Sequence, residues 1–187
     1  DSNKAYNGLV AKSIKNKTYI FDAAGRMRTG LFKLDNVTKG SSATPMEGYF
    51  YFTEEEGSTE GQMVTNKKVT VEIDGEDETY YFKKNGEAYV ATVISGSLYG
   101  DEGALVTDYG DGSTYQVVDG IGYDFFTEKS QTESSKISGE AMILVNGNGK
   151  IKKSGTVTDM DGLKVTVKDY VVTKIVDENK TVIYEAE

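Results

Sequence analysis

The chain has 187 residues, with 30 acidic and 21 basic side chains, a formal net charge of −9 at pH 7, and no Cys, His or Trp. The absence of Cys and His excludes disulfides, thiolate and imidazole metal sites, and Ser-His-Asp and Cys-His catalysis. The negative charge disfavours nucleic acid, because phosphate binding depends on Lys and Arg.

The composition favours short strands joined by tight turns. Gly is frequent at 21, Pro occurs once, and 13 Tyr and 7 Phe are spread along the chain. Gly, Asn and Asp tolerate the positive φ that hairpin turns require. No run of about 18 apolar residues is present, so we expect no membrane insertion. The chain opens at Asp1 in mid-pattern, and we expect a secreted precursor whose signal peptide has been removed.

A hairpin is predicted at 18–30, TYIFDAAGRMRTG, which we name repeat 1. Period-two alternation places Tyr19 and Phe21 on one face of a strand. A turn that contains Gly25 then reverses the chain, so that Met27 can pack against the two rings.

The same order of apolar strand, turn glycine and returning apolar residue recurs in three further segments, and a fourth, 98–107, matches only the turn and the returning residue. We name these copies repeats 2 to 5: 48–66, 79–92, 98–107 and 141–155. The glycine and the apolar residue two positions later are Gly25 and Met27, Gly61 and Met63, Gly86 and Ala88, Gly103 and Leu105, and Gly149 and Ile151. The gaps between copies are irregular, so we expect insertions or extra hairpins between them.

Strands are also predicted outside the repeats, at 68–73, 163–167, 171–176 and 181–184. In the first two, apolar and polar residues alternate, and each adjoins an Asp-Gly turn. The last two are predicted to form a hairpin at the C-terminal end, suited to cap a stack of hairpins. The polar, Ser-rich stretch 127–139 is predicted to be a loop. Little in the sequence favours a helix.

The segment TYIFDAAGRMRTG resembles the repeat of choline-binding and glucan-binding proteins and of clostridial toxin repeat regions. That repeat reads roughly aromatic-Tyr-x-Phe-Asp-x-x-Gly-x-Met-x-Thr-Gly-aromatic, and the resemblance extends over about half of the chain. It implies that hairpins of about 20 residues stack into a β-solenoid, each burying its face against its neighbours. The expected fold is all-β, with tandem β-hairpins stacked as an elongated β-solenoid-like array and a more regular β segment at the C-terminal end. We expect the hairpin repeats over 1–119, and further hairpins with a weak repeat near 141–155 and a terminal cap over 120–187.

In the resembled family, aromatic rings of successive hairpins form cages that hold choline by cation–π attraction. The equivalent slots here hold Thr18, Tyr49, Thr79, Leu31 and Lys67. Only one of these residues is aromatic, so we transfer the fold and not the choline ligand.

The two faces of each aromatic strand have different expected roles. The alternating aromatics of the repeat are expected to form the core: Tyr19, Phe21, Phe50, Phe52, Tyr80 and Phe82. The rings on the opposite face are ligand-binding candidates, because an exposed Tyr offers an apolar face and a polar tip to a sugar: Tyr49, Tyr51 and Tyr81. Cross-strand packing is an equal alternative for these three. Tyr99 and Tyr109 lie near Gly-rich turns and are further candidates for lining a groove.

Two segments, 108–113 and 159–162, place oxygen side chains at alternate positions before Gly, as calcium loops do. The bidentate Glu that such a loop needs downstream is absent, and Asp-Gly is a common hairpin turn, so we expect no metal. No spacing singles out a pair of carboxylates for glycoside hydrolysis. We therefore expect neither an enzyme nor a cofactor.

These features favour a non-catalytic extracellular surface module of a Gram-positive cell, located at the cell wall or cell surface. It would attach to cell-wall polymer or another carbohydrate through aromatic grooves between hairpins. The main alternative is a structural spacer or adhesin stalk whose repeats have lost ligand binding. A third possibility is a compact all-β domain in which the repeat match is local. The sequence does not specify an oligomeric state.

Overall fold

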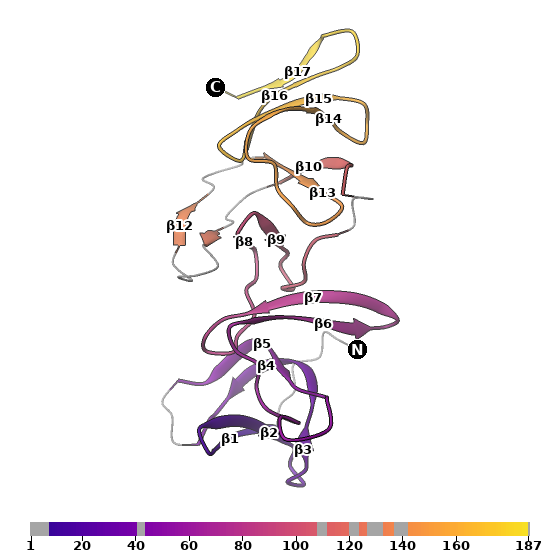
Figure 1. Cartoon of the computed structure of the whole chain (residues 1–187). Coiled ribbons are helices and arrows are strands. Elements are labelled where there is room, and N and C mark those ends of the chain that lie inside the picture. The colour runs from indigo at the N-terminus through magenta and orange to yellow at the C-terminus, as the bar shows by residue number, and fades with distance from the viewer. Residues whose placement is uncertain are drawn as a thin grey trace. The chain divides into compact units, whose positions relative to one another are not determined.

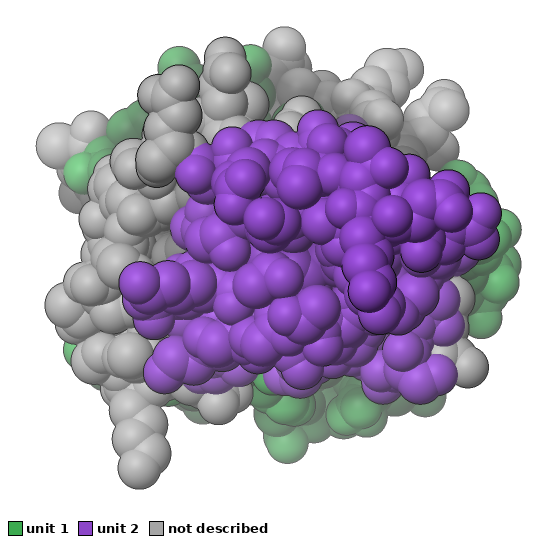
Figure 2. All heavy atoms as spheres, turned by 90° about the horizontal axis from the view of Figure 1, so that it is seen from above, with its two compact units in different colours: residues 1–89 green, residues 90–187 purple. Residues whose placement is uncertain are grey.

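The computed structural model describes residues 8–40, 44–107, 112–119, 124–126, 133–136 and 142–186. Every helix or strand assigned within these ranges is a strand, which confirms the all-β prediction. Across the same ranges, no helix has the length and apolar character needed to cross a membrane. The chain divides into two compact units, residues 1–89 (unit 1) and 90–187 (unit 2), which Figure 2 colours separately. The boundary predicted between residues 119 and 120 separates the hairpin repeats from the further hairpins that follow them. The two compact units do not test this boundary, so it stays a prediction.

Unit 1 is built from consecutive antiparallel hairpins (Figure 1). Its strands are β1 (Val10–Ile14), β2 (Lys17–Phe21), β3 (Met27–Arg28), β4 (Gly30–Val37), β5 (Met46–Phe52), β6 (Lys67–Ile73) and β7 (Glu76–Phe82). The first three strands form one sheet, β4 pairs with β5, and β6 pairs with β7. The strand predicted at 68–73 is confirmed as β6.

Unit 2 contains the remaining strands in three sheets. They are β8 (Thr92–Ile94), β9 (Ser97–Tyr99), β10 (Tyr115–Asp119), β11 (Asp124–Phe126), β12 (Glu133–Lys136), β13 (Met142–Asn146), β14 (Gly155–Thr158), β15 (Lys164–Lys168), β16 (Val171–Val176) and β17 (Val182–Glu185). The sheet orders are β12-β11-β8-β9, β10-β13 and β14-β15-β16-β17. The last sheet is an antiparallel meander, which confirms a regular C-terminal β segment and its terminal hairpin.

One prediction about unit 2 is wrong. The stretch 127–139 was expected to be a loop, yet β12 forms within it and pairs with β11, while 127–132 and 137–139 lie outside the described residues. Strand β11 also pairs in parallel with β8, about 30 residues earlier in the chain. Polar composition gives no sign of such pairing, because main-chain hydrogen bonds hold it together and they are available to any residue except Pro.

The repeat itself is visible as a shared main-chain contact. In every copy, the residue two positions after the turn glycine faces the end of the preceding strand: Phe21 with Met27, Phe52 with Met63, Phe82 with Ala88, Tyr99 with Leu105, and Val145 with Ile151. All five turn glycines have positive φ, from 70° at Gly149 to 90° at Gly86. The predicted Gly-x-apolar register is therefore confirmed in repeats 1 to 5.

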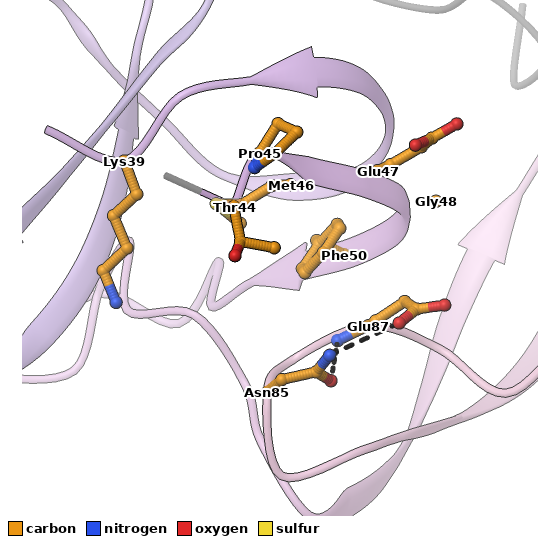
Figure 3. Close-up of a pocket in the computed structure, with 9 residues that line it drawn as sticks. All are labelled: Lys39, Thr44, Pro45, Met46, Glu47, Gly48, Phe50, Asn85 and Glu87. Carbon is orange, nitrogen blue, oxygen red and sulfur yellow. Dashed lines mark hydrogen bonds between the residues drawn. The ribbon is translucent and has the colours of Figure 1, made fainter. Parts of the chain in front are cut away.

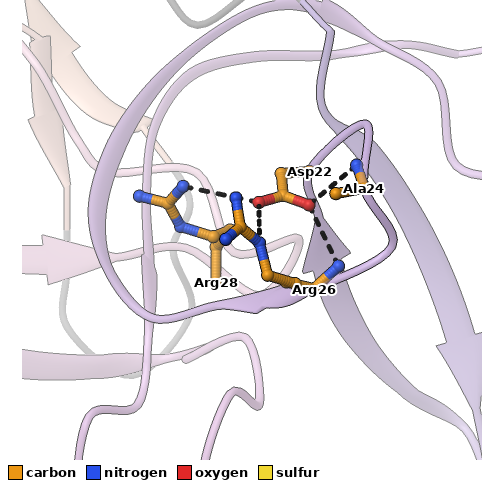
Figure 4. A network of polar contacts seen from close by, with 4 residues as sticks. All are labelled: Asp22, Ala24, Arg26 and Arg28. Carbon is orange, nitrogen blue, oxygen red and sulfur yellow. Dashed lines mark hydrogen bonds and ion pairs between the residues drawn. The ribbon is translucent and has the colours of Figure 1, made fainter.

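Figure 4 shows the turn of repeat 1, which is set by Asp22. The Asp22 N–H donates to the Arg26 carbonyl at 3.0 Å, and the Gly25 N–H donates to the Asp22 carbonyl at 2.9 Å. The Asp22 carboxylate Oδ1 accepts the N–H groups of Ala24 and Arg26, each at 3.0 Å. A three-residue hairpin loop that ends on a left-handed glycine has this arrangement. The same two main-chain bonds close the turns that begin at Lys83, Gly100, Asn146, Asp159 and Asp177.

The turn that begins at Asp159 explains the calcium-like spacing there. Its carboxylate Oδ1 accepts the N–H groups of Asp161 at 3.0 Å and Leu163 at 2.9 Å, so the side chain caps its own turn. The other calcium-like segment, 108–113, falls largely outside the described residues.

The core of unit 1 lies between its successive hairpins. Ile20, on β2, clusters with Phe50 and Phe52 of β5 and with residues of β4. The opposite face of β5 packs on β7, where Tyr49 lies 6.3 Å from Tyr80 between ring centroids. The β4–β5 hairpin is therefore covered on both faces, as in a stacked repeat.

Candidate ligand-binding pocket between repeats 2 and 3

The Tyr candidates from the sequence are buried where the structure describes them. Tyr49, Tyr51, Tyr81 and Tyr99 are 5, 9, 5 and 0% exposed. Tyr109 lies outside the described residues. The expectation that the opposite-face rings are exposed is therefore wrong for the first three. The physical reason is ring packing within unit 1. Tyr49 and Tyr51 are covered by Tyr80 and Phe82 of the next hairpin, and Tyr81 is covered by Tyr89.

The buried rings are packed on other aromatic rings rather than lining a groove. Tyr51 stacks on Phe82 with centroids 6.3 Å apart, and Tyr81 lies 5.7 Å from Tyr89. The Tyr51 hydroxyl donates to Glu54 Oε2 at 3.1 Å. Burial, followed by the nearby Glu54 charge, raises the pKa of Tyr51 to about 12. The core role expected for Phe50, Phe52, Tyr80 and Phe82 is confirmed, since each is at most 3% exposed. The same expectation is wrong for Tyr19 and Phe21, which are only half-buried, because β2 turns its other face, with Ile20, into the core.

Lysines of the chain itself lie over two of the candidate rings. Lys33 Nζ is 5.1 Å from the centroid of Tyr49, and Lys68 Nζ is 5.7 Å from that of Tyr81. Both pairs are direct cross-strand neighbours, Lys33 opposite Tyr49 and Lys68 opposite Tyr81. The chain's own ammonium groups thus occupy the positions at which these rings attract a cation.

An open pocket lies where the start of repeat 2 meets the turn of repeat 3 (Figure 3). It has a volume of about 600 Å³ and is lined by the segment 44–48, Phe50, Lys39, Asn85 and Glu87. That volume is within the range of small-molecule sites. All of its lining residues belong to unit 1.

The pocket combines an apolar floor with a polar rim. Met46 and Phe50 are 8 and 3% exposed and belong to the core of unit 1, so they give the pocket a fixed apolar base. Pro45 adds a rigid, exposed apolar ring. Around them stand the hydroxyl, amide, ammonium and carboxylate groups of Thr44, Asn85, Lys39, Glu47 and Glu87.

Glu87 is held in place on the rim. Its Oε1 accepts a hydrogen bond from Lys83 Nζ at 2.9 Å, and its Oε2 accepts one from Asn85 Nδ2 at 3.3 Å. Its N–H donates to Asn85 Oδ1 at 3.2 Å. The turn of repeat 3 therefore presents an amide and a carboxylate in a defined arrangement (Figure 3).

Two backbone features bring the rim together. A bulge in the β4–β5 ladder, between Leu34 and Val37, shifts the register before Met46. Gly48 has φ of +102°, and a Cβ there would lie 3.3 Å from Glu87 Cγ. Gly48 thus permits the close approach of β5 to the turn of repeat 3.

The sequence analysis did not identify the rim residues. It placed a turn at Gly86 and assigned no binding role to the neighbouring Asn85 and Glu87. Glu47 immediately precedes repeat 2 and has no distinguishing pattern around it. The one signal for the pocket in the sequence was that its two segments lie at a boundary between repeats. A stacked architecture leaves hollows between successive turns at such boundaries.

The residues in the choline-cage slots differ in exposure. Thr18 and Tyr49 are buried, Thr79 and Leu31 are half-buried, and Lys67 is exposed. Tyr49 alone presents a ring, and Lys33 lies over it. Among the described residues, no group of three or more carboxylates is arranged to hold a metal ion.

Comparison with known proteins finds no matching family model and no matching curated protein. Solved structures similar to the chain include choline-binding domains from Streptococcus pneumoniae. The domain of Spr1274 is 23% identical, with 54% of this chain and 95% of that chain covered and a TM-score of 0.35. The domain of CbpL is 13% identical, with 95% and 87% covered and a TM-score of 0.38. The modular autolysin LytC, solved with a synthetic peptidoglycan ligand, is 16% identical, with 93% and 33% covered and a TM-score of 0.31. The domains of Spr1274 and CbpL are choline-binding domains, and the segment 18–30 resembles the repeat of choline-binding proteins.

Proposed function

We propose that the chain is a non-catalytic binding module that attaches to a cell-wall polymer or another carbohydrate through the pocket between repeats 2 and 3. The observation that carries this proposal is the combination of a pocket of about 600 Å³ with a fixed apolar floor and a rim of hydrogen-bonding groups. A sugar ring has apolar C–H faces and a hydroxyl edge. The floor of Met46, Phe50 and Pro45 suits the face, and the rim suits the edge.

The proposal assigns two roles to the aromatic residues. Tyr49, Tyr51 and Tyr81 are buried packing residues, and the rim residues contact the ligand. Tyr109, outside the described residues, remains a candidate for a second site, whereas Tyr99 is fully buried and does not. The resemblance of repeat 1 to wall-binding repeats supports a location at the cell wall or cell surface.

Co-sedimentation with insoluble cell-wall polymer and with insoluble glucan tests the proposal. The double variant Glu47→Ala/Asn85→Ala removes two exposed rim groups. Each lost hydrogen bond to ligand weakens binding by about 0.5–1.5 kcal/mol, so we expect the dissociation constant to rise about tenfold. The matched control, Glu55→Ala/Asn179→Ala, makes the same chemical changes at exposed positions outside the pocket. Full retention of the rim variant, or no retention of the parent chain, would refute the proposal.

The same samples test the non-catalytic assignment. The rim contains two carboxylates, Glu47 and Glu87, and glycoside hydrolysis uses such pairs. We expect no release of reducing ends from the polymer during prolonged incubation. Release that Glu87→Gln abolishes would instead identify a hydrolase.

A structural spacer is the second candidate function. Its support is that Tyr49 and Tyr81 are buried and have lysine ammonium groups over their rings, so they offer no open aromatic groove. A parent chain that is retained on no wall polymer and no glucan, yet is stably folded, would favour the spacer.

A further inference from the structure

Opposite charges stand on opposite sides of the pocket. Figure 3 shows Lys39 at one side and the carboxylates of Glu47 and Glu87 at the other, with Thr44 and Pro45 between them. A molecule seated on the floor therefore has a cation at one end and carboxylates at the other.

Two of the charges that line the pocket, those of Lys39 and Glu47, are not compensated by the protein. Within the ranges that the structure describes, neither Lys39 nor Glu47 makes a side-chain hydrogen bond or ion pair. Glu87, by contrast, already binds Lys83 and Asn85. Lys39 and Glu47 are thus left to pair with groups of a ligand.

This arrangement discriminates between ligand charges. A neutral sugar leaves both charges unpaired. A purely cationic ligand pairs with Glu47 but is repelled by Lys39, and a purely anionic ligand has the reverse problem. A ligand with an anionic group at one end and a protonated amine at the other pairs with both.

We propose that the pocket selects a zwitterionic amino sugar, with its phosphate or carboxylate toward Lys39 and its protonated amine toward Glu47. The inference depends on the proposed function, because it names the class of carbohydrate that the same pocket takes. The amine and the anion are the shared chemistry, and either a phosphorylated or a carboxylated amino sugar supplies it.

Four sugars that differ in the group at C2, hydroxyl or amine, and at C6, hydroxyl or phosphate, test the selection: glucose, glucosamine, glucose 6-phosphate and glucosamine 6-phosphate. Isothermal calorimetry at low ionic strength, where exposed charges are least screened, gives their affinities. We expect glucosamine 6-phosphate to bind most tightly. Loss of either charge should weaken binding by up to about fivefold, the range of an exposed ion pair. Muramic acid, an amino sugar whose anion is the carboxylate of a lactyl ether at O3, distinguishes a carboxylated from a phosphorylated ligand.

Two charge-removing variants locate the selection in the pocket. In the Lys39→Met variant, glucosamine 6-phosphate should no longer bind more tightly than glucosamine. It should still bind more tightly than glucose 6-phosphate. Glu47→Gln should do the reverse. Lys164→Met and Glu72→Gln, at exposed positions away from the pocket, should change neither preference.

The inference fails if the four sugars bind equally, if glucosamine 6-phosphate does not bind, or if the variants leave the preferences unchanged. Co-sedimentation with polymer separates this failure from that of the proposed function. Continued retention that depends on Glu47 and Asn85 would mean that the pocket binds a carbohydrate of another charge class. Loss of retention as well would mean that both proposals are wrong.

Discussion

Met63 packs directly over Gly86: a Cβ built on Gly86 would lie 2.6 Å from both Sδ and Cε of Met63. The same relationship joins Met27 with Gly61, and Leu105 with Gly149. The apolar residue of one repeat thus fills the space that the turn glycine of the next leaves open. Main-chain bonds accompany the contact, since the Met63 N–H donates to Thr18 and the Ala88 N–H to Tyr49, each at 2.8 Å. The turn glycine therefore permits both the positive φ of the turn and the close packing of successive repeats.

Gly86→Ala should destabilise the chain by about 2–5 kcal/mol, the sum of a left-handed backbone penalty and overpacking against Met63. Gly75→Ala is the matched control, because Gly75 has a similar φ of +88° and nothing within 4 Å of its Cβ position. We expect the control to lose only the backbone part, about 1–2 kcal/mol. Urea unfolding measures both, and equal losses would disprove the packing role of the glycine.

Met63→Ala in the Gly86→Ala background tests the contact itself. Removing the thioether makes room for the new methyl group, so the double variant should be less destabilised than the sum of the two single variants. Additive losses would show that Met63 and the glycine do not interact.

Tyr49→Phe and Tyr51→Phe should change stability in opposite directions. The Tyr49 hydroxyl is buried and finds no hydrogen-bond partner in the described part of the chain, so its removal should raise the free energy of unfolding by about 1 kcal/mol. Removal of the Tyr51 hydroxyl breaks its hydrogen bond to Glu54 and should lower the free energy of unfolding by about 0.5–1.5 kcal/mol. Thermal and urea unfolding give both values. A destabilised Tyr49→Phe would mean that this hydroxyl has a partner after all.

Asp22 should make unit 1 sensitive to acid. The N–H of Arg26 that donates to its carboxylate lowers the pKa of Asp22 below 3.8. Because the folded pKa is depressed, the stabilisation is fully present above about pH 4 and is lost as pH falls through the folded value. The stability difference between the parent and Asp22→Asn should therefore shrink below about pH 4. Urea midpoints between pH 7 and pH 2.5 measure it, and a difference that is constant over this range would contradict the assignment.

The repeat register could be predicted because its signals are local. A turn that needs positive φ at Gly25, Gly61 or Gly86 leaves a glycine in the sequence, and period-two alternation leaves Phe50 and Phe52 beside it. The exposure of Tyr49, Tyr51 and Tyr81 could not be predicted in the same way. Whether the second face of a hairpin is open depends on how many neighbours it has, and no local pattern records that number.

The pocket and β12 could not be predicted for a related reason. The rim joins Glu47 to Asn85 and Glu87, residues about 40 positions apart that meet only after the hairpins stack. Likewise, β12 depends on β11, which in turn depends on parallel pairing with β8. Such pairings leave no periodicity in the polar segment that takes part in them.

A titration of the isotope-labelled chain with soluble fragments of wall polymer, followed through its backbone amide signals by NMR, tests the pocket most directly. We predict saturable shifts at Lys39, Glu47, Gly48, Asn85 and Glu87, with the amides of 164–176 unchanged. Saturable shifts that avoid these five residues, or none at a concentration where the polymer retains the chain, would show that carbohydrate is bound elsewhere.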